Sequence, residues 1–177
     1  MAIKISGTTI VNDSRVVENA DKIVFHNLLK KNVGVEGLML LSTCNRTEIY
    51  CESANGSDDI KNWLLSDQEY KSFAKHLYIH QEEDAIEHLF KVVAGLDSMV
   101  IGESEVLGQV KTAYKTALEN KSIDGKLKRL FEYSFSVAKN VRTNTDIGGN
   151  AISFMYCLLY TSPSPRDRTR SRMPSSA

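Results

Sequence analysis

Cys44 lies in the one segment whose residue types and spacing alone suggest a reactive centre, LSTCNRTEIY at 41–50. A hydroxyl, an amide and the guanidinium of Arg46 flank the thiol. A nearby cation and turn N–H groups stabilise a thiolate, which lowers the pKa of a cysteine and makes it a nucleophile. A lone cysteine is also a common apolar core filler, so both interpretations stay open from these residues. Cys51, inside the next expected strand, fits the filler role better.

His88 is the second candidate for chemistry. The helix expected at 83–94 has an apolar stripe of Ile86, Leu89, Phe90 and Val93, and at 100° per residue His88 points about 200° away from Ile86. We therefore predict that it is no core histidine and that it faces either solvent or a cleft. In a cleft it would serve as an acid/base or positioning group. The other three histidines, His26, His76 and His80, are assigned no function.

The elements that must position these residues follow from periodicity. Alternating or continuously apolar runs predict strands at 4–10, 37–42, 47–52 and 76–81. A tight connection at 43–46 then makes a hairpin with Cys44 at its tip. Helical spacing predicts helices at 14–31, 83–94, 104–120 and 124–144, the last capped by Asp124. It also predicts either two short helices at 58–66 and 67–75 or one broken helix over both ranges. The fold class is α+β: a small mixed or antiparallel sheet with helices, then a helical segment.

Composition narrows the class of protein. The chain has 177 residues, 42% hydrophobic and 25% charged, which is typical of a globular domain. No apolar run reaches the ~18 to 20 residues of a membrane span. Three cysteines without metal or disulfide spacing are expected to be separate thiols in a reducing compartment, with no metal site.

The C-terminal 21 residues differ from the rest. They contain all three prolines and four of the eight arginines, which leaves 18 basic and 21 acidic residues in 1–156. A disordered, basic nucleic-acid-binding extension is one interpretation. The string CLLYTSPSPRDRTRSRMPSSA also resembles translated sequencing-adapter read-through. We therefore expect 157–177 to be a disordered, non-native tail without function.

Three blocks of the remaining sequence resemble one family. They are STCNRTEIY (42–50), EHLFKVVAGLDSMVIGESEVLGQVKTAY (87–114) and AKNVRTNTDIGGNAIS (138–153). Together, and in this order, they resemble the N-terminal region of glutamyl-tRNA reductase. The resemblance implies NADPH-dependent reduction of glutamyl-tRNA(Glu) to glutamate-1-semialdehyde through a cysteine thioester. This reaction is the first step of tetrapyrrole (porphyrin and haem) biosynthesis from glutamate, in the bacterial cytoplasm.

The resemblance also implies roles for individual residues. Cys44 would be the nucleophile and His88 a second catalytic residue. Arg46 would hold the side-chain carboxylate of the substrate, and Glu103 or Glu105 its α-ammonium group. The implied substrate-binding residues are Thr43, Asn45, Arg46, Ser98, Glu103, Ser104, Glu105 and Gln109. Glutamine is frequent in the family at the position of Glu105, and residues 11–20 depart from the family's pattern.

The implied domain limits are 1–147 for the N-terminal catalytic domain and 148–156 for the truncated start of a linker or nucleotide-binding domain. The family's NADPH-binding and dimerisation domains would follow, so this chain is expected to carry only acyl transfer. A homodimer and an association with the next enzyme of the pathway are expected only of the complete enzyme. Two alternatives remain. One is a cysteine-dependent hydrolase, and the other is a non-catalytic tRNA-binding or regulatory module that uses the basic residues of one helix, Lys126, Lys128, Arg129, Lys139 and Arg142.

Overall fold

The computed structural model describes residues 7–11, 31, 35, 37–43, 46–52, 58–66, 74, 77–98, 100–123 and 125–148. The helix expected at 14–31, the segment 67–75, the Asp124 cap and the tail at 157–177 lie wholly or almost wholly outside these residues. Within them, no helix combines the length and apolar composition that crossing a bilayer requires.

Four strands form one antiparallel sheet in the order β2-β3-β1-β4. They are β1 (Gly7–Val11), β2 (Gly37–Ser42), β3 (Thr47–Glu52) and β4 (Leu77–His80). β2 and β3 have the predicted bounds, whereas β1 ends one residue later than expected and β4 ends one residue earlier. Because β4 pairs only with β1 in the described part of the chain, it forms one edge of the sheet.

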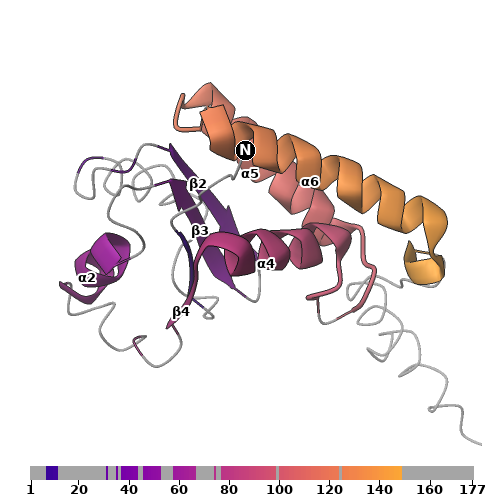
Figure 1. Cartoon of the computed structure of the whole chain (residues 1–177), viewed down its shortest axis with the longest axis horizontal. Helices are drawn as coiled ribbons and strands as arrows, with labels where there is room; N and C mark the ends of the chain where they lie inside the picture. Colours follow the sequence, from indigo (N-terminus) through magenta and orange to yellow (C-terminus); the bar gives the residue numbers. More distant parts are fainter. Residues whose placement is uncertain are drawn as a thin grey trace, which may run out of the picture.

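Helices cover both faces of this sheet (Figure 1). α2 (Asp58–Ser66) lies on one side, and α4 (Glu82–Ala94), α5 (Glu105–Glu119) and α6 (Gly125–Asn144) lie on the other. A short 3₁₀ helix, η2 (Asp146–Gly148), follows α6. This arrangement confirms the α+β class, and the last three helices match their predicted ranges to within one residue.

The alternation of β3 explains the two layers, because successive side chains of a strand point to opposite faces. Ile49 and Cys51 pack with Ile60 and Leu64 of α2 in the smaller core. Tyr50 packs on the opposite face in the larger core, which α4, α5 and α6 build around Leu89, Val110 and Phe131. Both faces of the central strand are therefore buried, and any charged side chain on it must find a partner inside the protein.

The connection between α4 and α5 turns sharply at two glycines. Gly95 adopts the left-handed conformation (φ 77°) that ends α4, and the N–H of Gly102 donates to the Gly95 carbonyl at 2.8 Å. A Cβ on Gly102 would lie 1.8 Å from the Ile147 carbonyl oxygen. Arg142 of α6 also donates to the carbonyls of Gly102 and Glu103, at 3.1 and 2.6 Å. The end of α6 thus fixes the loop that carries residues 95–104.

Candidate active site

The hairpin between β2 and β3 is closed on both sides of the predicted nucleophile. The Thr43 N–H donates to the Arg46 carbonyl at 2.9 Å, and the Arg46 N–H donates to Thr43 Oγ1 at 3.2 Å. The predicted hairpin is confirmed. Cys44 and Asn45 themselves lie outside the described residues, so their roles stay predictions. The two residues that bracket them, Thr43 and Arg46, are well defined by these bonds.

Glu48 is a buried carboxylate at the centre of the site, with no exposed surface. One of its oxygens accepts a hydrogen bond from the Tyr50 hydroxyl. The other lies 3.1 Å from His88 Nε2 and 3.2 Å from Arg46 Nε. A buried charge is tolerated only when it is paired and hydrogen-bonded, and Glu48 meets both conditions. It therefore joins the hairpin, the sheet and α4 at one point.

Tyr50 remains a donor to Glu48 because its environment opposes ionisation. Burial first, and then the adjacent Glu48 carboxylate, raise the pKa of Tyr50 well above its usual range. Its ring is fixed by an edge-to-face contact with Phe131 at 5.2 Å. The neutral phenol thus holds one side of the carboxylate in place.

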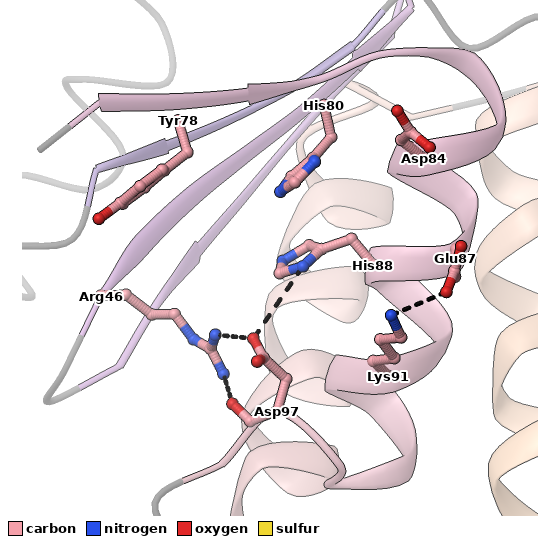
Figure 2. A pocket seen from close by; sticks show the side chains of 8 residues that line it. All are labelled: Arg46, Tyr78, His80, Asp84, Glu87, His88, Lys91 and Asp97. Atoms are coloured by element: carbon pink, nitrogen blue, oxygen red, sulfur yellow. Dashed lines mark hydrogen bonds and ion pairs between the residues drawn. The ribbon is translucent and has the colours of Figure 1, made fainter.

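Arg46 reaches across the site to the loop after α4. Its guanidinium donates to the side-chain carboxylate of Asp97 and to the Asp97 backbone carbonyl (Figure 2). A planar guanidinium offers a fork of donors that suits a carboxylate. The family resemblance implies that the Arg46 guanidinium holds a carboxylate of the substrate. In this structure the guanidinium already holds the carboxylate of Asp97.

His88 sits at the border between core and cleft. The buried residues of α4 are Ala85, Leu89, Val92, Val93 and Ala94, whereas Ile86 is only partly buried. The expected stripe of Ile86, Leu89, Phe90 and Val93 is therefore right for Leu89 and Val93 but omits Val92, and His88 lies about 40° around the helix from Val92. This explains why only 12% of its side chain is exposed. A carboxylate can only accept, so the contact with Glu48 fixes a proton on Nε2 and turns Nδ1 toward Asp97, 4.0 Å away.

A pocket of about 570 Å³ opens in front of these residues. Figure 2 shows Arg46, His88 and Asp97 at one end and side chains of β4 at the other. The lining residues are Arg46, Tyr78, His80, Asp84, Glu87, His88, Lys91 and Asp97. Its volume lies in the range of about 300 to 1,000 Å³ that is usual for small-molecule sites.

Among the described residues, the other predicted substrate-binding residues are not part of the lining of this pocket. Ser104 precedes α5 and Glu105 begins it, both exposed, and Thr43 and Glu103 are partly buried. Ser98 Oγ and Gln109 Oε1 are buried atoms that have no hydrogen-bond partner in the described part of the chain. Since buried polar groups are normally satisfied, these two atoms are available to a ligand. The roles assigned to this group remain predictions.

Cys51 behaves as the filler that the sequence predicts. It has no exposed surface, and burial raises the pKa of its thiol to about 12. At neutral pH it is therefore a protonated thiol within the smaller core, unsuited to nucleophilic attack.

Not all of the basic residues of α6 are available to bind nucleic acid. Lys126 Nζ lies 2.8 Å from Glu52, and Arg142 is partly buried against the loop carbonyls described above. Lys128, Arg129 and Lys139 are exposed. Two of the five residues that the tRNA-binding alternative uses are thus engaged within the protein.

Sequence reasoning missed much of the pocket. Glu48 could have been found, because a carboxylate in the middle of a strand that is buried on both faces demands a partner. Asp97 was visible only as one polar residue in a glycine-rich run. Tyr78 and His80 gave no signal, since alternation in a short edge strand does not tell which face meets a cavity.

Comparisons with known proteins identify the family of this chain. A family model described as the N-terminal domain of glutamyl-tRNA(Glu) reductase matches residues 3–145. The glutamyl-tRNA reductase of Aliivibrio fischeri is 46% identical over 132 residues, which are 72% of this chain and 32% of that protein. The corresponding protein of Aliivibrio salmonicida is 47% identical over 135 residues, with the same shares covered.

A solved structure supports the same assignment. The glutamyl-tRNA reductase from Methanopyrus kandleri matches with a TM-score of 0.65 and 26% identity, over 83% of this chain and 36% of that one. The chain thus spans about a third of the length of the curated relatives it matches. On these matches the chain belongs to the glutamyl-tRNA reductase family, through that family's N-terminal domain.

Proposed function

We propose that this chain performs the acyl-transfer half of the NADPH-dependent reduction of glutamyl-tRNA(Glu) to glutamate-1-semialdehyde, the first step of tetrapyrrole biosynthesis from glutamate. The observation that carries the proposal is the Arg46 guanidinium, which Glu48 holds beside His88 at the mouth of a pocket and next to the hairpin tip that contains Cys44. The names of the relatives supply the substrate. A cytoplasmic location is part of the proposal.

The acyl step is a substitution at the ester carbonyl. The Cys44 thiolate attacks the carbonyl carbon, a C–S bond forms, and the bond to the ribose 3′-oxygen of the tRNA breaks. That oxygen takes up the proton that the Cys44 thiol gave up, and His88, whose Nδ1 is free of a proton when Nε2 donates to Glu48, is the candidate carrier or positioning group. The products are a glutamyl thioester on Cys44 and free tRNA. Water that attacks the thioester releases glutamate and restores the thiol.

The contacts of Arg46 indicate how the side-chain carboxylate of the substrate would be bound. Glutamate that is esterified through its α-carboxyl keeps a free side-chain carboxylate. This carboxylate would replace that of Asp97 on the guanidinium fork, while Glu48 continues to hold Nε. The Asp97 side chain is nearly half exposed, so its carboxylate can rotate into solvent while the backbone of the loop stays in place. Ser98 and Gln109, with their unpartnered buried atoms, are the proposed contacts for the rest of the glutamyl group, together with Thr43, Asn45, Glu103, Ser104 and Glu105.

NADPH finds no fitting site among the described residues. Their sheet is entirely antiparallel and contains no βαβ unit with a glycine-rich turn at a helix N-terminus, the arrangement that holds a dinucleotide pyrophosphate. We therefore derive no hydride step here. NADPH binding, dimerisation and association with the next enzyme of the pathway are proposed for the complete protein only. The domain limits 1–147, 148–156 and 157–177 remain part of the same proposal.

Arg46→Lys is expected to raise the KM for glutamyl-tRNA by about tenfold, because lysine keeps the charge but loses the bidentate fork. It should also weaken the preference for glutamyl-tRNA over glutaminyl-tRNA, whose side chain is a neutral amide. The measurement is the rate of labelled amino-acid release from both substrates. Arg129→Lys, an exposed position on α6, is the matched control. An unchanged preference in Arg46→Lys would contradict this role of Arg46.

Incubation of the chain with glutamyl-tRNA and NADPH tests the division of the reaction. We expect slow release of free glutamate without oxidation of NADPH, since the described residues offer the acyl-transfer groups but no dinucleotide site. Formation of glutamate-1-semialdehyde, with NADPH oxidised in proportion, would refute this division.

A further inference from the structure

The pocket extends beyond the residues that are proposed to hold the glutamyl carboxylate. Arg46, His88 and Asp97 occupy one end, and the side chains of Tyr78 and His80 extend from β4 over the other (Figure 2). The proposed glutamyl group accounts for the Arg46 end only. The β4 end is therefore left for the part of the substrate that is attached to the glutamyl carbonyl.

Tyr78 and His80 are arranged to receive a flat ring. They are two residues apart on one strand, so their side chains lie on the same face of the sheet. Their Cα atoms are about 6.6 Å apart, roughly twice the thickness of an aromatic ring. The His80 ring is already stacked on His88, with centroids 4.9 Å apart and an angle of 17° between the planes. Tyr78 is 49% exposed, so its side chain is accessible to a ligand in the pocket. An aromatic ladder thus runs from His88 to His80 and can be extended toward Tyr78.

The charges of the pocket select against phosphate. Arg46 is paired with Asp97, and Lys91 Nζ lies 2.7 Å from Glu87 Oε1, so both cations are already neutralised. Asp84 adds a further carboxylate to the lining. A phosphate would be repelled here, whereas a neutral nucleoside could stack on the rings and offer its amino or hydroxyl groups to Asp84.

We propose that Tyr78 and His80 bind the terminal adenosine of the aminoacylated tRNA, with the adenine stacked on the Tyr78 ring. This inference rests on the proposed function, because the glutamyl ester of a tRNA is carried on the ribose of that adenosine. The base must then lie within one ribose of the carbonyl that Cys44 attacks. The β4 end of the pocket offers aromatic rings, and the two cations of the described lining are paired with carboxylates. Stacking on an aromatic ring binds any base without reading its edges.

The test uses the full chain and a stable analogue, 3′-glutamylamino-3′-deoxyadenosine, in which an amide replaces the reactive ester. Tyr78→Leu should bind this analogue about tenfold more weakly, which is the usual scale of loss when one stacking ring is removed. Tyr78→Phe, which keeps the ring, should bind like the wild type. Tyr133→Leu, an exposed tyrosine on α6 outside the pocket lining, is the control. Far-UV circular dichroism and a melting curve would show that each variant is folded.

A second substrate separates this inference from the proposed function. Glutamate α-methyl ester has the glutamyl group without a nucleoside, so its rate of hydrolysis should be equal in wild type and Tyr78→Leu. Equal binding of the adenosine analogue by the two proteins would overturn the adenosine site, and so would an equal loss on both the analogue and the methyl ester. A chain that binds the analogue with the expected dependence on Tyr78, but transfers no glutamyl group from either ester, would refute acyl transfer and leave the adenosine site standing.

Discussion

Cys44→Ser is expected to lower the rate of glutamyl-tRNA deacylation by roughly 10³-fold or more, the scale of loss when a covalent nucleophile is removed. A serine hydroxyl remains protonated where the thiol can ionise, and it cannot form a thioester. The measurement is release of labelled glutamate from glutamyl-tRNA under single-turnover conditions. Far-UV circular dichroism should be unchanged, because the substitution alters one atom.

Cys51→Ser is the matched control for this experiment. Its thiol is fully buried in the smaller core and protonated at neutral pH. The rate should therefore stay near that of the wild type. The free energy of unfolding should fall by about 1 kcal/mol, because a hydroxyl replaces a well-packed sulfur. Loss of activity in Cys51→Ser together with an active Cys44→Ser would show that the nucleophile has been assigned to the wrong cysteine.

Glu48→Leu is expected to lower the free energy of unfolding by about 3 to 5 kcal/mol, as measured by urea denaturation. Removing one member of a buried ionic network leaves the others without compensation. Here the Arg46 guanidinium and the Tyr50 hydroxyl would both lose their buried partner. Glu48→Gln keeps the shape and part of the hydrogen bonding, so its loss should be smaller. Both variants should also raise the KM for glutamyl-tRNA, because the contact of Glu48 with Arg46 Nε, which orients the guanidinium, is weakened or lost.

Glu52→Gln provides the comparison on the same strand and the same face. Its carboxylate pairs with Lys126, whose side chain is half exposed. A pair that is open to solvent contributes about 0 to 1 kcal/mol. If the Glu48 variants lost no more stability than Glu52→Gln, the buried network would not be the organising feature of the site.

The sequence predicted the elements that are governed by local pattern. The apolar run of β2, the alternation of β3 and the polar connection at 43–46 are contiguous signals, so the hairpin was found with the right bounds. The last three helices were found for the same reason. The class α+β followed from the order of these elements.

The contacts that make the site could not be predicted, because they join residues far apart in the chain. The bonds between Arg46 and Asp97 span 51 residues, and that between Glu48 and His88 spans 40. Periodicity shows that α4 has an apolar stripe, but not which residue lies at its centre. The predicted stripe included the partly buried Ile86 and Phe90 and omitted the fully buried Val92, so it placed His88 too far from the core.

Mass spectrometry of the protein, denatured in acid after brief incubation with labelled glutamyl-tRNA and no NADPH, is the most direct test of the central claim. We predict a single glutamyl adduct that maps to the peptide containing Cys44, survives acid and is released by hydroxylamine, as a thioester is. Wild-type protein that consumes glutamyl-tRNA but carries no adduct on Cys44, or carries it on Cys51, would contradict the account.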